Sequence, residues 1–383
     1  MYHIGVIGCG NRMMTLVNRI LQYDDFCIQC ICDTDCDAVK KRLSELSPQP
    51  KNYDSICYYT DAKKMLDEQK PDAVCIGTRC STHTEFALLA AQYNIPIFLE
   101  KPVATTWKDA EKLKSILRLN NKIVVSFPLR VSKITRCVKE IVDSGNLGKI
   151  QHVQAYNNVP YGRGYYHKWY RDEGITGGLF LQKATHDLDY INYVLGDRTP
   201  VRICAIKSKQ IFKGDKPDGL KCKDCAEQTT CPESPQNYGA PCILDEFYCC
   251  FARDTGNEDS GSAIIQYEDG MHVVYSQNFF VRKGAKKRGA RFMGYNGTVE
   301  FDFYTGEVKV YYHNQDRVDT HTFGDTASHF GGDSILIENF VQIVRGAEES
   351  HSTLESGILS ANMCLAAKKS SETYQFCSIK SGR

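Results

Sequence analysis

A short apolar run at the N-terminus ends in the glycine turn Gly8-Cys9-Gly10, and apolar residues with helical spacing follow from Met14 to Leu21. Gly8 permits a tight turn, and Gly10 lets the backbone approach a phosphate group closely. The N-terminus of the following helix offers free N–H groups and the positive end of its dipole. This strand, glycine turn and helix together predict a site for the pyrophosphate of a dinucleotide.

A second apolar run, Cys27 to Cys32, ends at Asp33, roughly 20 residues after the turn. A carboxylate at that strand end accepts hydrogen bonds from the adenosine ribose hydroxyls and repels a 2′-phosphate, so Asp33 favours NAD over NADP. The position at which the pattern normally has a third glycine or an alanine holds Met13. This methionine implies a slightly wider approach of helix and strand.

Strands and helices continue to alternate up to Phe127, which predicts a parallel, doubly wound sheet, a Rossmann domain over residues 1–127. In such sheets ligands bind outside the carboxyl ends of the strands. The segments that follow the strands are therefore expected at the site: Thr78 to His83, Glu100-Lys101-Pro102 and Pro128 to Arg130.

From about Gln151 the pattern changes to longer strands with alternating hydrophobicity, separated by turn signals such as Asn296-Gly297. Helical patterns at 334–345 and 353–370 close the chain. Residues 128–383 are thus predicted to form an α+β domain with a large, mostly antiparallel sheet, and the whole chain is of the α/β class. The basic segment Lys283 to Arg291 is interpreted as a solvated loop between two strands.

The segment Tyr161 to Arg171 is rich in aromatic and basic residues. Aromatic faces stack on the C–H surfaces of sugars, while basic side chains donate to hydroxyl or carboxylate oxygens. The segment predicts a sugar, polyol or sugar-acid substrate, with His167, Trp169 and Arg171 as the strongest candidates for contact. An ordered loop that packs on the core is the alternative.

The chain has 383 residues and a formal net charge of +1, which argues against a nucleic-acid partner. The N-terminus has no export signal, and no apolar run approaches the roughly 18 residues needed to span a bilayer. The 18 cysteines are scattered through apolar runs, where they resemble small buried hydrophobic residues. We expect a reduced, cytoplasmic protein with no membrane partner.

Four cysteines lie in a segment rich in Lys, Pro and Gly, an insert over about residues 214–245: Cys222, Cys225, Cys231 and Cys242. The first pair has the spacing of zinc ligands, but the second pair does not. A structural metal, a loop of free thiols and a disulfide remain alternatives, and no metal ligand is assigned.

The glycine turn, the segment TRCSTHTEFALLAA, the tripeptide Glu100-Lys101-Pro102 and the later GGLFLQKATHDLDYINYVLG resemble one family along essentially the whole chain. This is the Gfo/Idh/MocA family of NAD(P)-dependent oxidoreductases, named after glucose-fructose oxidoreductase, inositol dehydrogenase and a rhizopine-catabolism protein. The resemblance implies that Lys101, before a cis proline, lies beside the nicotinamide and binds the reacting oxygen. It implies that His186 is the general acid/base. It also implies an open second sheet whose exposed face forms a homodimer or homotetramer.

The predicted cofactor-binding residues are Gly8, Gly10, Asn11, Arg12, Met13, Asp33, Thr34, Thr78, His83, Glu100, Lys101 and Arg130. Many dehydrogenases of the family have an aspartate four positions before the histidine. Here that position is Gln182, and Lys183 follows; both are predicted to contact the substrate.

The expected activity is hydride transfer between NAD and a sugar, cyclitol or related polyhydroxy compound. Gln182 and Lys183 leave one alternative open, an enzyme with tightly bound NAD that oxidises a glycoside, eliminates or hydrolyses it, and re-reduces the product. A non-catalytic NAD-binding sensor is the alternative from another class, and the presence of both Lys101 and His186 argues against it.

Overall fold

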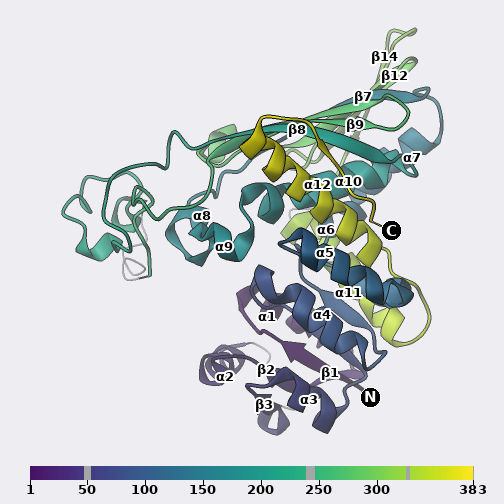
Figure 1. Ribbon diagram of the computed structural model, residues 1–383. Coiled ribbons are helices and arrows are strands. Elements are labelled where there is room, and N and C mark those ends of the chain that lie inside the picture. Colours follow the sequence, from purple (N-terminus) through teal and green to yellow (C-terminus); the bar gives the residue numbers. More distant parts are fainter. Residues whose placement is uncertain (47–52, 239–245, 325–327, 383) are drawn as a thin grey trace.

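Within the described residues, the N-terminal part of the chain forms a parallel sheet of six strands (Figure 1). The structure is a computed structural model that describes residues 1–46, 53–238, 246–324 and 328–382. The strands are β1 (Tyr2–Ile7), β2 (Phe26–Cys32), β3 (Cys57–Tyr59), β4 (Ala73–Ile76), β5 (Ile97–Leu99) and β6 (Ile123–Val125). Their order is β3-β2-β1-β4-β5-β6, with parallel pairing throughout, so the predicted doubly wound sheet is confirmed.

The helices of this part mostly begin at residues able to cap them. They are α1 (Asn11–Ile20), α2 (Cys36–Ser44), α3 (Ala62–Gln69), α4 (His83–Ala91) and α5 (Trp107–Leu113). The side chains of Asp35, Asp61 and Thr106 accept hydrogen bonds from first-turn N–H groups of α2, α3 and α5, which satisfies donors that have no partner inside the helix. In contrast, α1 follows Gly10 and has no capping side chain.

The second sheet has nine strands in the described residues, in the order β14-β13-β12-β11-β7-β10-β9-β8-β15. They are β7 (Ile150–Asn158), β8 (Pro200–Ser208), β9 (Ser260–Tyr267), β10 (His272–Asn278), β11 (Lys287–Gly294), β12 (Gly297–Asp302), β13 (Glu307–Tyr312), β14 (Arg317–Thr322) and β15 (Cys377–Ser378). Apart from the parallel pair of β7 and β10, neighbouring strands are antiparallel. This confirms the predicted large, mostly antiparallel sheet.

The interpretation of residues 283–291 as a solvated loop is wrong for its second half. Lys287 opens β11, which pairs with both β7 and β12 in the interior of the sheet. Arg288 on this strand is 3% exposed. The strand was missed because its basic residues hide the alternation, although one of them faces a buried carboxylate.

Seven further α-helices lie in the described residues: α6 (Pro128–Val131), α7 (Lys133–Asp143), α8 (Gly164–His167), α9 (Glu173–Thr176), α10 (Thr185–Leu195), α11 (Gly332–Val344) and α12 (Leu354–Thr373). Of these, α7, α10 and α12 contact strands of the second sheet. Late in the chain, α11 returns to the N-terminal sheet and packs beside α1 (Figure 1). There the Phe340 ring lies 5.6 Å from the Phe98 ring, edge to face, so the first core includes residues from both ends of the chain.

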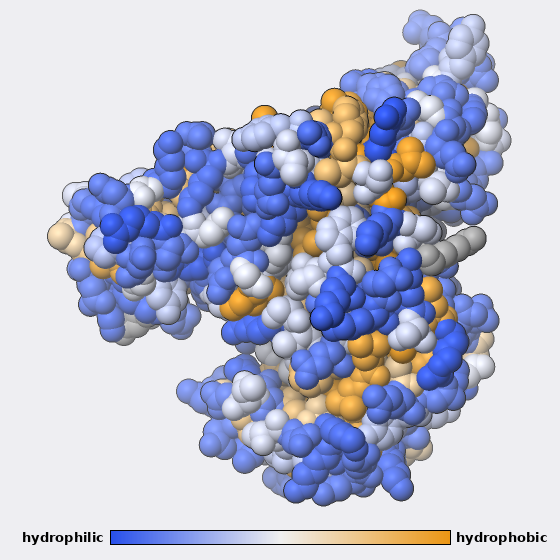
Figure 2. Space-filling view, in the orientation of Figure 1, coloured by the Kyte–Doolittle hydropathy of each residue, from blue (hydrophilic) through white to orange (hydrophobic). Residues whose placement is uncertain are grey.

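The cysteine-containing insert belongs to an arm that projects from the second sheet (Figure 1). In the space-filling view this arm is mainly hydrophilic on its surface (Figure 2). Its thiols Cys222, Cys225 and Cys231 line a small cavity together with Cys249. The described cysteines are free, and no group of three or more described His, Cys, Asp or Glu side chains is arranged to hold a metal ion. Cys242 lies outside the described residues.

None of the helices in the described ranges is long and apolar enough to cross a membrane.

The packing of α1 on the sheet explains how Met13 replaces the third glycine of the turn. A Cβ built on Gly77, just after β4, would lie 2.7 Å from the Met13 Cε. A glycine in the helix normally allows the helix and the sheet to approach closely. Here Gly77, directly after β4, allows that approach instead.

Replacing Gly77 with alanine should lower the free energy of unfolding by about 1–3 kcal/mol, because the added methyl group overpacks the contact with Met13. Met13→Ala in the same chain should restore part of that loss, and chemical denaturation of the double-mutant cycle measures this coupling. Gly284→Ala is the matched control, since its Cβ would meet no atom within 4 Å. Equal stability of G77A and G284A would contradict the packing argument.

Candidate active site

The glycine turn has the shape that a pyrophosphate requires. Gly8 has φ +78°, and a Cβ there would lie 2.6 Å from Thr78 Cγ2, so a larger residue does not fit. A Cβ on Gly10 would meet nothing within 4 Å. Open space therefore lies beside the uncapped N-terminus of α1, where Asn11 and Arg12 begin the helix. These features fit a dinucleotide phosphate.

Asp33 anchors this turn as well as ending β2. Its Oδ2 accepts a hydrogen bond from the Cys9 N–H at 2.7 Å, and its Oδ1 accepts one from the Asp35 N–H at 3.1 Å. Asp33 is half-buried, and the neighbouring Thr34 is exposed. The carboxylate thus faces the turn at the edge where a ribose would lie.

Arg12 joins the turn to a distant part of the chain. Its Nε donates to Glu100 Oε1 at 3.0 Å, and its two Nη atoms donate to Asp333 at 2.9 and 2.6 Å. Burial opposes ionisation of Asp333, but hydrogen bonds from His329 and Arg12 outweigh it and lower the pKa of that carboxyl. Arg12 was predicted as a cofactor contact, and the structure uses it to hold α11 against the turn.

Lys101 follows β5 and precedes a cis peptide bond to Pro102, as the resemblance implied. Its Nζ donates to the backbone carbonyl of Gln182 at 2.9 Å. Burial, followed by the nearby charge of Lys183, lowers the pKa of Lys101 to about 8. The ring of His83 lies 2.8 Å from Pro102 O and 3.2 Å from Thr78 O. His83 therefore holds the strand-end segments together.

His186 lies in the first turn of α10, directly after a π-helical segment, η5 (Phe180–Ala184). It is 5% exposed, and its Nδ1 has no hydrogen-bond partner among the described residues. Gln182 Oε1 is also buried and has no hydrogen-bond partner among these residues. Burial, followed by the charges of Lys101 and Arg288, lowers the pKa of His186 well below its ordinary value. The imidazole is therefore neutral near pH 7 and able to accept a proton.

A second histidine, His329, lies beside His186, with the two ring centroids 6.1 Å apart. Its Nδ1 is 2.9 Å from Asp333 Oδ2. His329 and Phe330 both have positive φ, 49° and 56°, a strained conformation for non-glycine residues that often marks functional sites. Neither His329 nor Asp333 was singled out from the sequence, because no local motif marks either residue.

A buried ion pair underlies this group. Asp187 accepts hydrogen bonds from Arg288 Nε at 2.8 Å, Asn157 Nδ2 at 2.7 Å and the Tyr275 hydroxyl at 2.9 Å. The three donors come from β11, β7 and β10. This carboxylate therefore fixes the start of α10, and with it His186, to the second sheet.

Several predicted site residues lie elsewhere. Arg130 makes two hydrogen bonds to Asp189 and thereby ties α6 to α10. In the aromatic segment, the buried His167 stacks on Phe247. Arg171 likewise binds Asp254 and Thr255.

His167 and Arg171 therefore pack inside the arm and are not brought to Lys101 and His186. Trp169 differs from them. Its ring stacks on that of Tyr170, with the two centroids 3.8 Å apart, and the Arg79 guanidinium of the first domain lies 3.9 Å from the Trp169 ring centroid. Trp169 therefore lies where the two domains meet.

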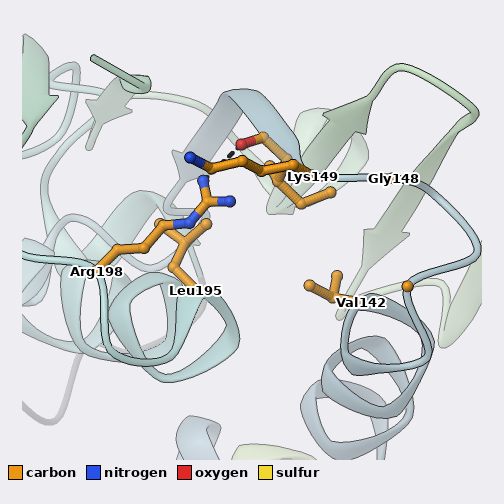
Figure 3. Close-up of a pocket in the computed structure, with 7 residues that line it drawn as sticks. Val142, Gly148, Lys149, Leu195 and Arg198 are labelled. Carbon is orange, nitrogen blue, oxygen red and sulfur yellow. Dashed lines mark hydrogen bonds between the residues drawn. The ribbon is translucent and has the colours of Figure 1, made fainter. Parts of the chain in front are cut away.

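A separate cavity of about 260 Å³ lies between the end of α7, the start of β7 and the end of α10 (Figure 3). Val142, Gly148, Lys149, Leu195 and Arg198 are among its lining residues. Arg198 donates to the backbone carbonyl of Ile150 there. The cavity contains none of the predicted site residues, so the chemistry is expected at Lys101 and His186.

Comparison with known proteins agrees with this geometry. A family model described as "Oxidoreductase family, NAD-binding Rossmann fold" matches residues 2–127. A second model, described as "Oxidoreductase family, C-terminal alpha/beta domain", matches residues 139–379. The chain belongs to the Gfo/Idh/MocA oxidoreductase family. It is therefore an oxidoreductase with an NAD-binding Rossmann domain.

Relatives in this family support the same class of activity. YteT of Bacillus subtilis (strain 168), named as a putative oxidoreductase, is 26% identical over an alignment of 344 positions, and the match covers 78% of each chain. Myo-inositol 2-dehydrogenase of Thermotoga maritima is 23% identical over 51% of this chain and 55% of its own length. A levoglucosan dehydrogenase in complex with NADH and levoglucosan has the same fold, with a TM-score of 0.75, 14% identity and 99% of both chains covered.

Removing the cation under the site should destabilise the fold. Arg288→Met leaves the Asp187 carboxylate buried without its ionic partner, and the free energy of unfolding should fall by about 3–5 kcal/mol. Arg317→Met is the control, because the Arg317–Asp319 pair lies at the surface, where water screens the attraction between the charges. Chemical denaturation measures both variants; a loss in R288M no larger than in R317M would disprove this role.

Proposed function

We propose that this oxidoreductase transfers a hydride between NAD and a hydroxyl-bearing carbon of a sugar, cyclitol or related polyhydroxy compound. The observation that carries the proposal is the group formed by Lys101 after β5, Gln182 in η5 and His186 in the first turn of α10. Gln182 Oε1 and His186 Nδ1 are buried polar atoms without a hydrogen-bond partner among the residues that the structure describes, which is typical of a site that receives a polar ligand. The myo-inositol and levoglucosan dehydrogenases among the relatives support this substrate class.

In this mechanism Lys101 donates a hydrogen bond to the reacting oxygen and stabilises the negative charge that develops there. His186, neutral because of burial and nearby cations, accepts the hydroxyl proton as the C–H bond breaks. Bound NAD supplies the hydride acceptor at the nicotinamide ring. In the reverse direction His186 returns the proton to the carbonyl oxygen. His329 lies beside His186, and its Nδ1 is within hydrogen-bond distance of Asp333. It provides a second imidazole to which His186 can pass the proton.

Lys101→Met should reduce NADH formation by about 100- to 1000-fold, because it removes the cation that stabilises the developing oxyanion. The Kd for NAD should change less than about threefold, since the glycine turn and Asp33 remain. NADH absorbance with myo-inositol, levoglucosan and glucose measures turnover, and intrinsic fluorescence measures NAD binding. Loss of NAD binding with no specific loss of turnover would contradict the assigned role.

The pH profile provides a second readout for the same residue. The Lys101 ammonium is present below its pKa of about 8 and is lost above it, so kcat/KM for oxidation should fall as the pH rises through this value. Lys101→Arg keeps a cation at higher pH, and the fall should shift upward in that variant.

We further propose NAD as the preferred cofactor over NADP, supported by the position of the Asp33 carboxylate beside the turn. Asp33→Asn keeps an oxygen for the Cys9 N–H but removes the charge that repels a 2′-phosphate. The ratio of NADP to NAD affinity should rise by about tenfold, the scale of one removed like-charge contact. Asp37→Asn, on the exposed side of α2, is the control, and an unchanged ratio in D33N would refute the assignment.

Gln182 stands where many dehydrogenases of the family have an aspartate, and this difference supports a second candidate function. In it, tightly held NAD is reduced and reoxidised within one catalytic cycle, so no net NADH forms. Co-purification of NAD together with product formation from a glycoside would identify it. A protein that binds NAD but converts no compound in a broad sugar and polyol panel would be a sensor.

A homo-oligomer is also proposed, on the face of the second sheet that carries Ile206 and Ile264, which are 58% and 48% exposed.

A further inference from the structure

Lys183 lies in the π-helical turn η5, immediately before the helix that carries His186. Such wider turns are rare and are frequently found at functional sites. Here the turn directs two consecutive polar side chains inward, and Gln182 and Lys183 are each 4% exposed. An ammonium removed from water is strongly disfavoured unless its charge is compensated. The groups around Lys183 therefore show whether its positive charge is compensated within the protein or is available to a ligand.

Within the described part of the chain, no carboxylate forms an ion pair with Lys183. Its ammonium donates to the Tyr161 hydroxyl and lies 4.6 Å from the centroid of the Tyr161 ring. The nearby carboxylate of Asp187 is already engaged by Arg288 and two neutral donors. A hydroxyl and an aromatic face stabilise a cation only partly, so the charge of Lys183 remains without a counterion.

Two further cations face the same region. Lys101 donates to a backbone carbonyl and forms no ion pair in the described residues. Arg288 uses its Nε for Asp187, while its Nη2 is buried and has no hydrogen-bond partner there. Burial, followed by the charge of Arg288, lowers the pKa of Lys183 to about 7. By its contacts, the site brings together three basic side chains, of which only Arg288 has a carboxylate partner in the described residues, and one unused buried donor.

We propose that the substrate is a sugar acid whose carboxylate binds between the Lys183 ammonium and Arg288 Nη2. The inference rests on the proposed function, since it names the substrate class of the same site. A carboxylate has two oxygens and one negative charge, which match one ammonium and one guanidinium nitrogen. Lys183 lies about one helical turn before His186, so the carboxylate and the reacting hydroxyl can belong to one sugar ring. Tyr161, whose hydroxyl accepts the Lys183 hydrogen bond, is half-exposed.

Binding to the full-length protein saturated with NADH tests this directly. Isothermal titration compares galacturonate with galactose and glucuronate with glucose, pairs that differ in the carboxylate. Each acid should bind about tenfold or more tightly than its neutral partner, the scale of a hydrogen bond to a charged group. Lys183→Met should remove this preference, lowering the affinity for each acid by about tenfold more than the affinity for its neutral partner. Lys183→Arg should retain it, and Lys149→Met, at an exposed position, should behave like the unmodified protein.

Equal affinity for acids and neutral sugars would overturn the proposal, as would an equal loss for both in K183M. If K183M fails to fold by circular dichroism, Lys183→Gln replaces it in the same comparison. Tighter binding of glucose 6-phosphate than of glucuronate, lost in the same variant, would overturn the carboxylate assignment in favour of a phosphate.

The failure of this inference is distinguishable from failure of the proposed function. Acids that bind through Lys183 but yield no NADH would refute hydride transfer and leave the carboxylate site standing. Turnover of neutral polyols without any preference for acids would do the reverse.

Discussion

The interaction on which the rest of the site depends is the buried ion pair between Asp187 and Arg288. Asp187 lies next to His186 at the start of α10, and its partners come from three strands of the second sheet. A completely buried carboxylate is tolerated because a charge-assisted hydrogen bond and two neutral donors satisfy it. The same contacts fix the rotation of α10 about its axis. That rotation points His186 and the preceding π-helical turn toward Lys101.

A second charged contact makes the two domains one site. Arg12 belongs to the glycine turn, and its guanidinium makes a two-pronged contact with Asp333 on α11. Glu100, the neighbour of Lys101, binds the same guanidinium. A planar guanidinium between two carboxylates has a strongly preferred geometry. The glycine turn, the residue before Lys101 and the segment that carries His329 are therefore held in fixed positions relative to one another.

Much of the fold could be predicted because its signals are local. Buried parallel strands are continuous apolar runs, and the turn at Gly8 needs a positive φ that glycine adopts freely. The errors arise where a residue's partner is distant. Arg288 resembles a solvated residue in a basic run, yet its partner Asp187 lies 101 positions earlier. His329 has no local pattern at all, since its importance comes from contact with His186.

The aromatic segment shows the same limit in another form. Aromatic and basic residues suit both sugar binding and the packing of a loop, and the sequence alone does not distinguish these uses. His167 and Arg171 find partners in the segment that follows the insert. Trp169, two residues from each, reaches the junction with Arg79. Alternate residues of one segment face different surroundings, which a composition argument averages.

The replacement of an aspartate by Gln182 changes the electrostatics of the whole group. An imidazole with a neighbouring carboxylate is stabilised as imidazolium, whereas His186 is near Lys101, Lys183 and Arg288 and remains neutral. The carboxylate that contacts an imidazole in this group is Asp333, and its partner is His329 rather than His186. A weaker base is sufficient here, because cations near a hydroxyl lower its pKa and stabilise the alkoxide. In the proposed mechanism, the positive charge that weakens His186 as a base also makes the substrate hydroxyl more acidic, and the same charge would favour the proposed anionic substrate.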